Sequence, residues 1–352
     1  MIVLASFLPA LVPAQTAGSG DAPEDWLRLD REIALLAQKP DSQPEESRIG
    51  GFIRTRYEIA DDPSGGDDVS GVVLGPVWLE FNGNVAEDVR YLLGFGFREE
   101  DGEPVLGVRD ARVSFPLTES VRSTVGQFRV PFLYSATSAR SKGLFLERSS
   151  QGAIWNRRDQ GWMLDGRVGR LRWFASAFNG GDGAREEFLL AGKLAWALLG
   201  PGIDLKQEGG YGVDSPTRVT TAVGVVDEGT IEGGTVLAAE LEGASGRFFF
   251  HGEIVDYGEG FVPKAVRQGA AKNASGRADT TPYGATLACM LSERCEVAAR
   301  YEGLDDANDS HKTWLGLNWY VRGHKCKWQL DWIRTEGADE GDVLQLGLTV
   351  GF

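Results

Sequence analysis

Residues 343–352 read VLQLGLTVGF, and in this stretch apolar side chains alternate with small or polar ones. Leucine, valine and phenylalanine hold the even positions from 344 to 352, while glutamine, glycine and threonine hold the odd positions between them. Successive side chains of a β-strand point to opposite faces, so this period of two predicts a strand with one apolar face. The same pattern recurs in 88–98, 312–322 and 325–335, so the chain is predicted to consist largely of such strands.

About sixteen segments of this kind follow one another from residue 48 onward. They are predicted at 50–60, 75–84, 88–98, 105–115, 120–130, 160–167, 169–178, 187–198, 218–226, 234–242, 246–257, 281–291, 295–303, 312–322, 325–335 and 343–352. Tight turns are expected at 168–169, 243–245, 292–294 and 323–324. Longer polar connections are expected at 61–74, 131–159, 258–280 and 336–342.

Short turns on one rim and long loops on the other are typical of an outer-membrane β-barrel, and an even number of strands closes the sheet with both ends on one side. The segment 199–217 is an exception, because it is long but falls on the short-turn rim. A soluble β-sandwich would show the same alternation. The terminal Phe352, the export signal described below and the even strand number favour an all-β transmembrane antiparallel barrel.

The chain ahead of the barrel has a different character. Residues 1–14 combine an apolar core with a small-residue cleavage site, which predicts a signal peptide. Residues 15–47 are predicted to be a periplasmic segment with a short amphipathic helix, because Trp26, Leu29, Ile33 and Leu36 recur at helical spacing. A trimerisation helix is the alternative. The barrel itself is assigned to residues 48–352.

Composition limits the possible partners and chemistry. The net charge of −15 argues against a nucleic-acid partner. Cys289 and Cys295 can pair in an oxidising periplasm or stay free. The three histidines are scattered, and His251-Gly252-Glu253 is interpreted as a hydrogen bond inside the barrel. No nucleophile lies beside a base in a known motif, so no catalytic residue, metal or cofactor is predicted.

Several motifs resemble those of a known family. The stretch VGQFRVPF (125–132), the run FLERS (145–149), the stretch RDQGWML (158–164) and the C-terminal run from Arg300 to Phe352 are, in this order, similar to the phosphate-selective porin O and P family. The resemblance covers roughly residues 48–352. It implies a sixteen-stranded homotrimeric outer-membrane porin whose third loop, 131–159, folds into the pore. It also implies that Phe352 serves as the terminal signal for barrel assembly.

Strand parity places more basic than acidic side chains in the lumen. The candidates for lining the pore or binding anions, including those on the third loop, are Arg54, Arg56, Arg90, Arg112, Arg129, Arg140, Lys142, Arg148, Arg157, Arg158, Arg172, Arg300, Lys325 and Lys327, with Lys193 as a further inward position. The low-dielectric wall of a barrel focuses the field of such charges, and guanidinium groups suit phosphate and carboxylate. The sequence therefore predicts a porin for small solutes with a preference for anions. Pairing with inward acids such as Asp159 and Asp165 would instead leave a general diffusion pore.

Two other classes of function fit parts of the sequence. A non-conducting barrel acting in adhesion or structure would use its long loops for recognition, and conductance measurements separate it from a pore. A barrel-embedded hydrolase is separated by an assay for lipid or peptide hydrolysis. The expected environment is outer-membrane lipid and lipopolysaccharide, whose phosphates divalent cations can bridge to acidic loops. Simple solvation of those loops is the alternative.

Overall fold

The barrel is seen in a computed structural model that describes residues 47–61, 68–86, 88–100, 103–180, 188–201, 207–212, 217–228, 234–258, 279–337 and 340–352. The predicted signal peptide and N-terminal helix lie outside these residues. The described strands are β1 (Arg48–Ala60), β2 (Val69–Leu74), β3 (Val77–Ala86), β4 (Val89–Glu100), β5 (Glu103–Pro116), β6 (Val121–Arg129), β7 (Arg158–Val168), β8 (Leu171–Phe178), β9 (Leu189–Leu199), β10 (Arg218–Glu228), β11 (Thr235–Ser245), β12 (Phe248–Tyr257), β13 (Tyr283–Ser292), β14 (Cys295–Gly303), β15 (His311–Tyr320), β16 (Cys326–Glu336) and β17 (Gly341–Gly351).

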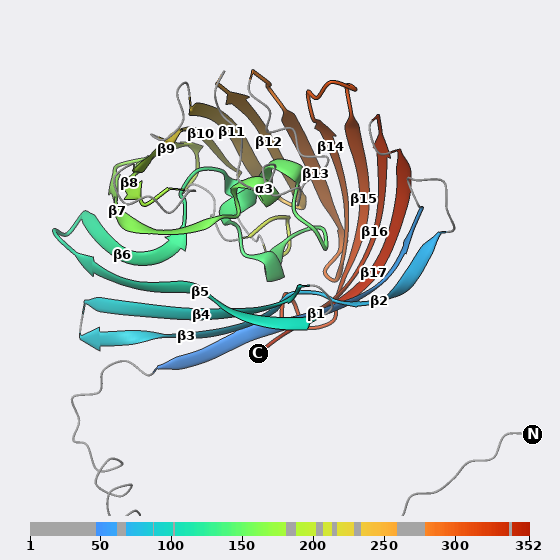
Figure 1. The fold of residues 1–352 in the computed structure, drawn as a ribbon, viewed down its shortest axis with the longest axis horizontal. Coiled ribbons are helices and arrows are strands. Elements are labelled where there is room, and N and C mark those ends of the chain that lie inside the picture. Colours follow the sequence, from blue (N-terminus) through green and yellow to red (C-terminus); the bar gives the residue numbers. More distant parts are fainter. Residues whose placement is uncertain are drawn as a thin grey trace, which may run out of the picture. The chain divides into compact units, whose positions relative to one another are not determined.

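All strands belong to one closed antiparallel sheet (Figure 1). β1 pairs along one edge with β17 and along the other with β2 and then β3. β2 and β3 are therefore one barrel strand, interrupted at Gly75-Pro76, where proline has no N–H to donate to the sheet. The barrel thus has sixteen strands, which confirms the predicted fold class and strand number.

Two of the predicted connections were wrong. Residues 69–74 form β2, although the sequence predicted a loop at 61–74. β11 continues through Ser245, and the turn lies at residues 246–247 rather than 243–245. Gly246 has a φ of +55° and supplies the left-handed conformation that this turn needs. The turns at 169–170 and 293–294 lie at or next to their predicted positions.

The outer face of the barrel is apolar, as the alternation predicted. In β17, Leu344, Leu346 and Val350 are between 41 and 46% exposed, whereas Gln345 and Thr349 between them are buried. The buried set faces the interior. Cys289, Cys295 and Cys326 are free thiols.

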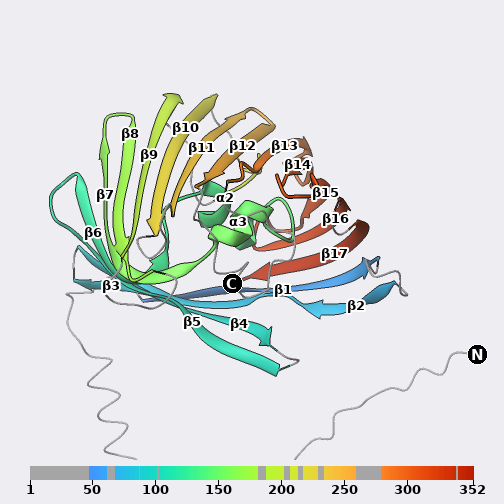
Figure 2. The same ribbon diagram turned by 45° about the horizontal axis from the view of Figure 1, so that its top comes forward.

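Three short helices lie inside the ring of strands (Figures 1 and 2): α2 (Tyr134–Thr137), η1 (Arg140–Lys142) and α3 (Ser150–Trp155). They belong to the inner loop, residues 130–157, that joins β6 to β7. This loop packs on the wall through two buried apolar clusters, one around Phe132 and Trp155 and one around Leu144 and Phe145. No helix in the described part of the chain is long and apolar enough to span a membrane.

Gly126, in the VGQF motif of β6, provides a test of the fold. Its φ is +123°, and an added Cβ would lie 2.1 Å from the Ala111 carbonyl oxygen on β5. We expect Gly126→Ala to destabilise the barrel by at least about 1–3 kcal/mol, the usual cost of a strained backbone position. The measurement is the unfolding midpoint in denaturant and the yield of refolded barrel.

Gly107→Ala on the neighbouring strand is the matched control, because an added Cβ there has no atom within 4 Å. An equal loss of stability in both variants would show that the backbone conformation of Gly126 does not cause the destabilisation.

Candidate functional site

The inner loop is held inside the barrel by charged and polar side chains of the wall. Arg54 of β1, which is fully buried, donates to the carbonyl oxygens of Leu146 and Arg140 and to Thr349 Oγ1. Lys327 donates to the Gly143 carbonyl, and Asp331 accepts the Leu146 N–H at 2.6 Å. A buried backbone group without a partner costs about 1–3 kcal/mol, so these wall residues make the inward position of the loop possible.

A second segment, Gln207–Gly212, enters the barrel from the short-turn rim and meets the inner loop. Glu208 accepts hydrogen bonds from the Leu144 N–H and the Ser138 hydroxyl, and it lies 3.6 Å from Arg300. Burial favours the neutral form of Glu208, but Arg300 and Arg148 outweigh this effect and lower its pKa. Glu208 therefore stays ionised at neutral pH. The connection 199–217 is therefore longer than the other connections on the short-turn rim because part of it folds into the barrel.

The part of the Gln207–Gly212 segment that follows Glu208 is fixed by an aromatic contact and a carboxylate. Tyr211 stacks on Tyr320 with ring centroids 4.1 Å apart and meets His324 edge-on at 5.2 Å. Glu296 accepts the Gly210 N–H at 2.6 Å and the Tyr320 hydroxyl. These polar and aromatic contacts place the inner loop and the Gln207–Gly212 segment against the inner faces of β1 and β14–β17.

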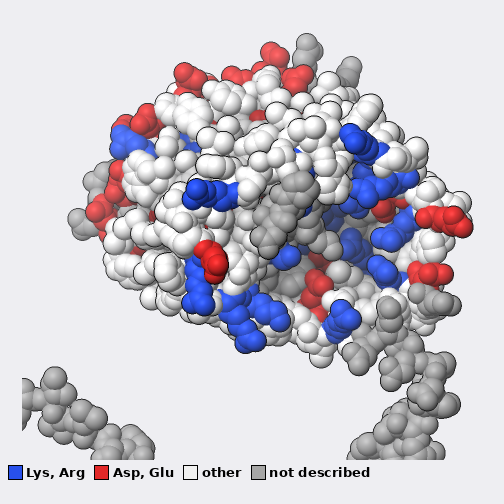
Figure 3. Space-filling model, turned by 180° about the vertical axis from the view of Figure 1, so that it is seen from behind, with Lys and Arg blue, Asp and Glu red and all other residues white. Residues whose placement is uncertain are grey.

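The opposite part of the interior is open. A cavity of about 730 Å³ lies against β1 and β3–β9, and a second of about 460 Å³ adjoins it. Both are lined by Glu80, Arg112 and Arg122. On the face of the molecule opposite to that of Figure 1, a hollow is bordered mainly by lysine and arginine side chains (Figure 3).

Basic side chains dominate the lining of the open cavities. The two together are lined by ten basic residues, namely Arg48, Arg90, Arg109, Arg112, Arg122, Arg129, Arg140, Arg158, Arg172 and Lys193. Only three acidic residues line them: Glu80, Asp110 and Asp165. Since an arginine always carries its charge, the surface of the open cavities is positive although the whole chain is acidic.

A β-bulge in β5 concentrates charge at this surface. Gly94 pairs with Asp110 and Phe95 with Val108, so Arg109 is the extra residue. The bulge reverses the strand parity, and both Arg109 and Asp110 line the larger cavity. Asp110 pairs with Arg158 at 3.0 Å, and the Arg158 guanidinium lies over Trp78 at 4.8 Å.

Comparison with known proteins identifies the family. The sequence pattern of the family described as phosphate-selective porin O and P matches residues 48–267. This chain belongs to that family. It is an outer-membrane porin, as the resemblance implied. A search of the curated proteins found no match.

Solved structures share the fold of this porin at low sequence identity. OmpF of Salmonella typhi, in complex with daunomycin, matches with a TM-score of 0.61 and 12% identity over 88% of this chain and 98% of the other. A loop-deletion mutant of OmpT from Vibrio cholerae matches with a TM-score of 0.59 and 10% identity, over 88% of this chain and 100% of its own. A mutant of the Rh. blastica porin matches with a TM-score of 0.56 and 11% identity, over 87% and 100%.

The predicted pore-lining residues of the porin fall into two groups. Six line the open cavities: Arg90, Arg112, Arg129, Arg140, Arg158 and Arg172. The other eight line neither cavity: Arg54, Arg56, Lys142, Arg148, Arg157, Arg300, Lys325 and Lys327. Arg48, Arg109 and Arg122 line the cavities and were missed by the sequence prediction.

The eight residues outside the cavities have other contacts or positions. Arg54, Arg148, Arg300 and Lys327 are buried. Arg54, Arg148 and Lys327 donate hydrogen bonds to carbonyl groups of the inner loop, and Arg300 pairs with Glu208. Burial lowers the pKa of Arg148 to about 10, which leaves it charged. Arg56 pairs with Glu58 and Glu147, and Arg157 lies 3.8 Å from Asp159. Lys142 binds Glu208 through its backbone carbonyl, and Lys325 is exposed in the turn before β16.

Arg54 provides a test of how the inner loop is held. We expect Arg54→Ala to destabilise the porin by about 1–3 kcal/mol for each loop carbonyl that loses its donor. The loosened loop should also raise the open-channel current noise. Both are measured on refolded protein, by denaturant titration and by single-channel recording.

Lys325→Ala is the control for Arg54, because it removes one positive charge from an exposed turn. If Arg54→Ala behaved like Lys325→Ala in both measurements, the anchoring role would be refuted.

Proposed function

We propose that this porin conducts small solutes by passive diffusion along the arginine-lined cavities and prefers anions. The observation that carries the proposal is the ten basic and three acidic side chains that line the open part of the lumen. Several weak positive sites in sequence allow an anion to enter and leave, whereas one tight site would trap it. Guanidinium groups favour phosphate and carboxylate among small anions.

Arg112 and Arg122 are the residues on which selectivity is proposed to depend. Both line the two cavities where these adjoin, so a solute that uses the whole path passes them. Neither forms an ion pair with an acidic residue in the described part of the chain. Arg158 and Arg172, in contrast, have their charge partly compensated by Asp110 and Asp165.

The surroundings of the porin are also part of the proposal. The exposed apolar side chains on the outward face of the strands fit outer-membrane lipid, with lipopolysaccharide beside the long loops. Among the structural neighbours, OmpT of Vibrio cholerae is described in a trimer form. We propose a homotrimer for this chain as well, to be checked by the mass of the detergent-solubilised porin.

Reversal potentials in planar bilayers under a salt gradient test the anion preference. We expect the wild type to pass chloride better than potassium. One unit charge at about 4 Å in water is worth about 1 kcal/mol, so Arg112→Gln and Arg122→Gln should each lower the anion-to-cation permeability ratio by up to about fivefold.

Lys325→Gln makes the same change of charge outside the cavities and should leave the ratio unchanged. A wild type that prefers cations would refute the anion preference. Unselective conductance would favour a general diffusion pore, and absence of conductance a barrel for adhesion or structure.

A further inference from the structure

Four ionisable side chains meet on the inner faces of β11 and β12, away from the residues proposed to set selectivity. Glu240 lies opposite Glu253 in the strand register, and Glu242 lies opposite His251. All four are at most 7% exposed. Lys193 on β9 pairs with Glu240 and also lines the larger cavity. Three carboxyl groups therefore share this buried region with one imidazole and one ammonium group.

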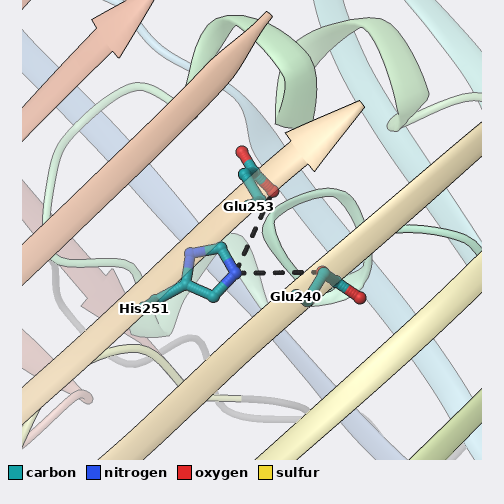
Figure 4. Close-up of side chains that lie close together, drawn as sticks. All are labelled: Glu240, His251 and Glu253. Atoms are coloured by element: carbon teal, nitrogen blue, oxygen red, sulfur yellow. Dashed lines mark ion pairs between the residues drawn. The ribbon is translucent and has the colours of Figure 1, made fainter. Parts of the chain in front are cut away.

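The His251 ring points into the gap between two of these carboxylates (Figure 4). Its Nε2 lies 3.8 Å from Glu240 Oε1 and 3.9 Å from Glu253 Oε2, too far for a hydrogen bond, and this buried nitrogen has no hydrogen-bond partner among the described residues. Glu242 Oε1 is also buried, and no described residue donates a hydrogen bond to it. Buried charges and polar atoms are usually paired or bound to a metal, so the chemistry of this gap suits a cation.

We propose that Glu240, His251 and Glu253 form a binding site for a divalent transition-metal ion such as Zn²⁺. One nitrogen and two oxygen ligand atoms lie within 4.8 Å of one another. Zinc binds histidine nitrogen and carboxylate oxygen at about 2.0–2.2 Å in a tetrahedral arrangement, which places neighbouring ligand atoms about 3.4 Å apart. The distances of 3.8 and 3.9 Å from His251 are close to this spacing, so small rotations of the three side chains would close the site around the ion. An imidazole ligand favours zinc over calcium or magnesium, which prefer oxygen.

The inner loop supplies the groups that orient these ligands. Glu240 Oε1 accepts the Tyr134 N–H, and Glu253 accepts the hydroxyl groups of Ser135 and Ser149. A carboxylate oxygen has two lone pairs, so it can accept one of these hydrogen bonds and still bind the ion. Such outer contacts fix the geometry of a metal site. The ion would reach the site from the larger cavity, past the Lys193 ammonium group.

Zinc binding to the folded, chelator-stripped porin tests the proposal independently of conductance. Equilibrium dialysis against ZnCl₂, with bound zinc counted by mass spectrometry, should give saturable binding of about one ion per chain at this site. His251→Gln and Glu253→Gln should each weaken binding by at least about tenfold. Lys193→Met should strengthen it, because the ammonium group no longer competes for Glu240. A purely structural role of Lys193 would produce no such gain.

His311→Gln is the matched control. His311 forms a 2.7 Å contact with Glu336 on the long-loop rim, and no third ligand is found beside this pair in the described part of the chain. This variant should bind zinc as the wild type does. Absence of saturable binding by the wild type would overturn the proposal, and so would unchanged affinity in a folded His251→Gln variant.

A measurement on the His311→Gln porin covers the case in which the cluster variants fail to fold. Its zinc X-ray absorption spectrum should show an imidazole nitrogen at about 2.0–2.1 Å together with oxygen ligands. A spectrum with oxygen ligands only would refute the assigned site.

Discussion

The inward position of residues 130–157 depends on one constraint: a backbone buried inside a barrel must find partners for its N–H and carbonyl groups. The wall of β11–β17 and β1 meets it with side chains of both charges. Asp331 accepts an N–H of the loop, while Arg54 and Lys327 donate to its carbonyls. Removing these charges would leave the loop groups unpaired, so they cannot be exchanged for apolar residues as freely as the outward positions can.

The same constraint creates the asymmetry of the lumen. The buried acids of β11–β16 lie beside the inner loop, the Gln207–Gly212 segment or one another, namely Glu240, Glu242, Glu253, Glu296, Glu302 and Asp331. The wall of β3–β8 meets the inner loop less extensively, chiefly through Arg129, which donates to the Thr137 and Ser138 carbonyls, and most of its arginines lie at the cavity surface. The chain carries a net negative charge, yet the surface of its open cavities is positive. The net charge of −15 alone does not indicate this distribution, because ten basic and only three acidic residues line the two open cavities.

Periodicity predicted the barrel well, because outward and inward side chains alternate along almost every strand and lipid enforces that alternation. It predicted the role of single lumen residues less well. Arg112 and Lys327 both occupy inward positions of their strands, and nothing in their local sequence separates the one that lines a cavity from the one beneath the loop. That difference depends on where residues 130–157 come to lie, which is decided by contacts far apart in the chain. Arg109 was missed for a local reason, the bulge that shifts parity within β5.

The cluster of Glu240, Glu242, His251 and Glu253 on β11 and β12 is subject to the same need for partners, but there some buried polar atoms have none among the described residues. Elsewhere in the filled half, the described carboxylates meet an N–H, a hydroxyl or an arginine at hydrogen-bonding or ion-pair distance. At Glu240, Glu242 and Glu253 the neighbouring strands bring acids opposite an acid and a histidine. The inner loop donates hydrogen bonds to Glu240 and Glu253, but among the described residues the only lysine or arginine in an ion pair with these acids is Lys193. Like charges at such positions repel, and a sheet tolerates them only if a proton or a cation compensates. The sequence shows His251 and Glu253 on one strand face, but Glu240 joins them only through the register of the neighbouring strand. A metal site built across two strands is therefore invisible to motif analysis and becomes evident only once the pairing is known.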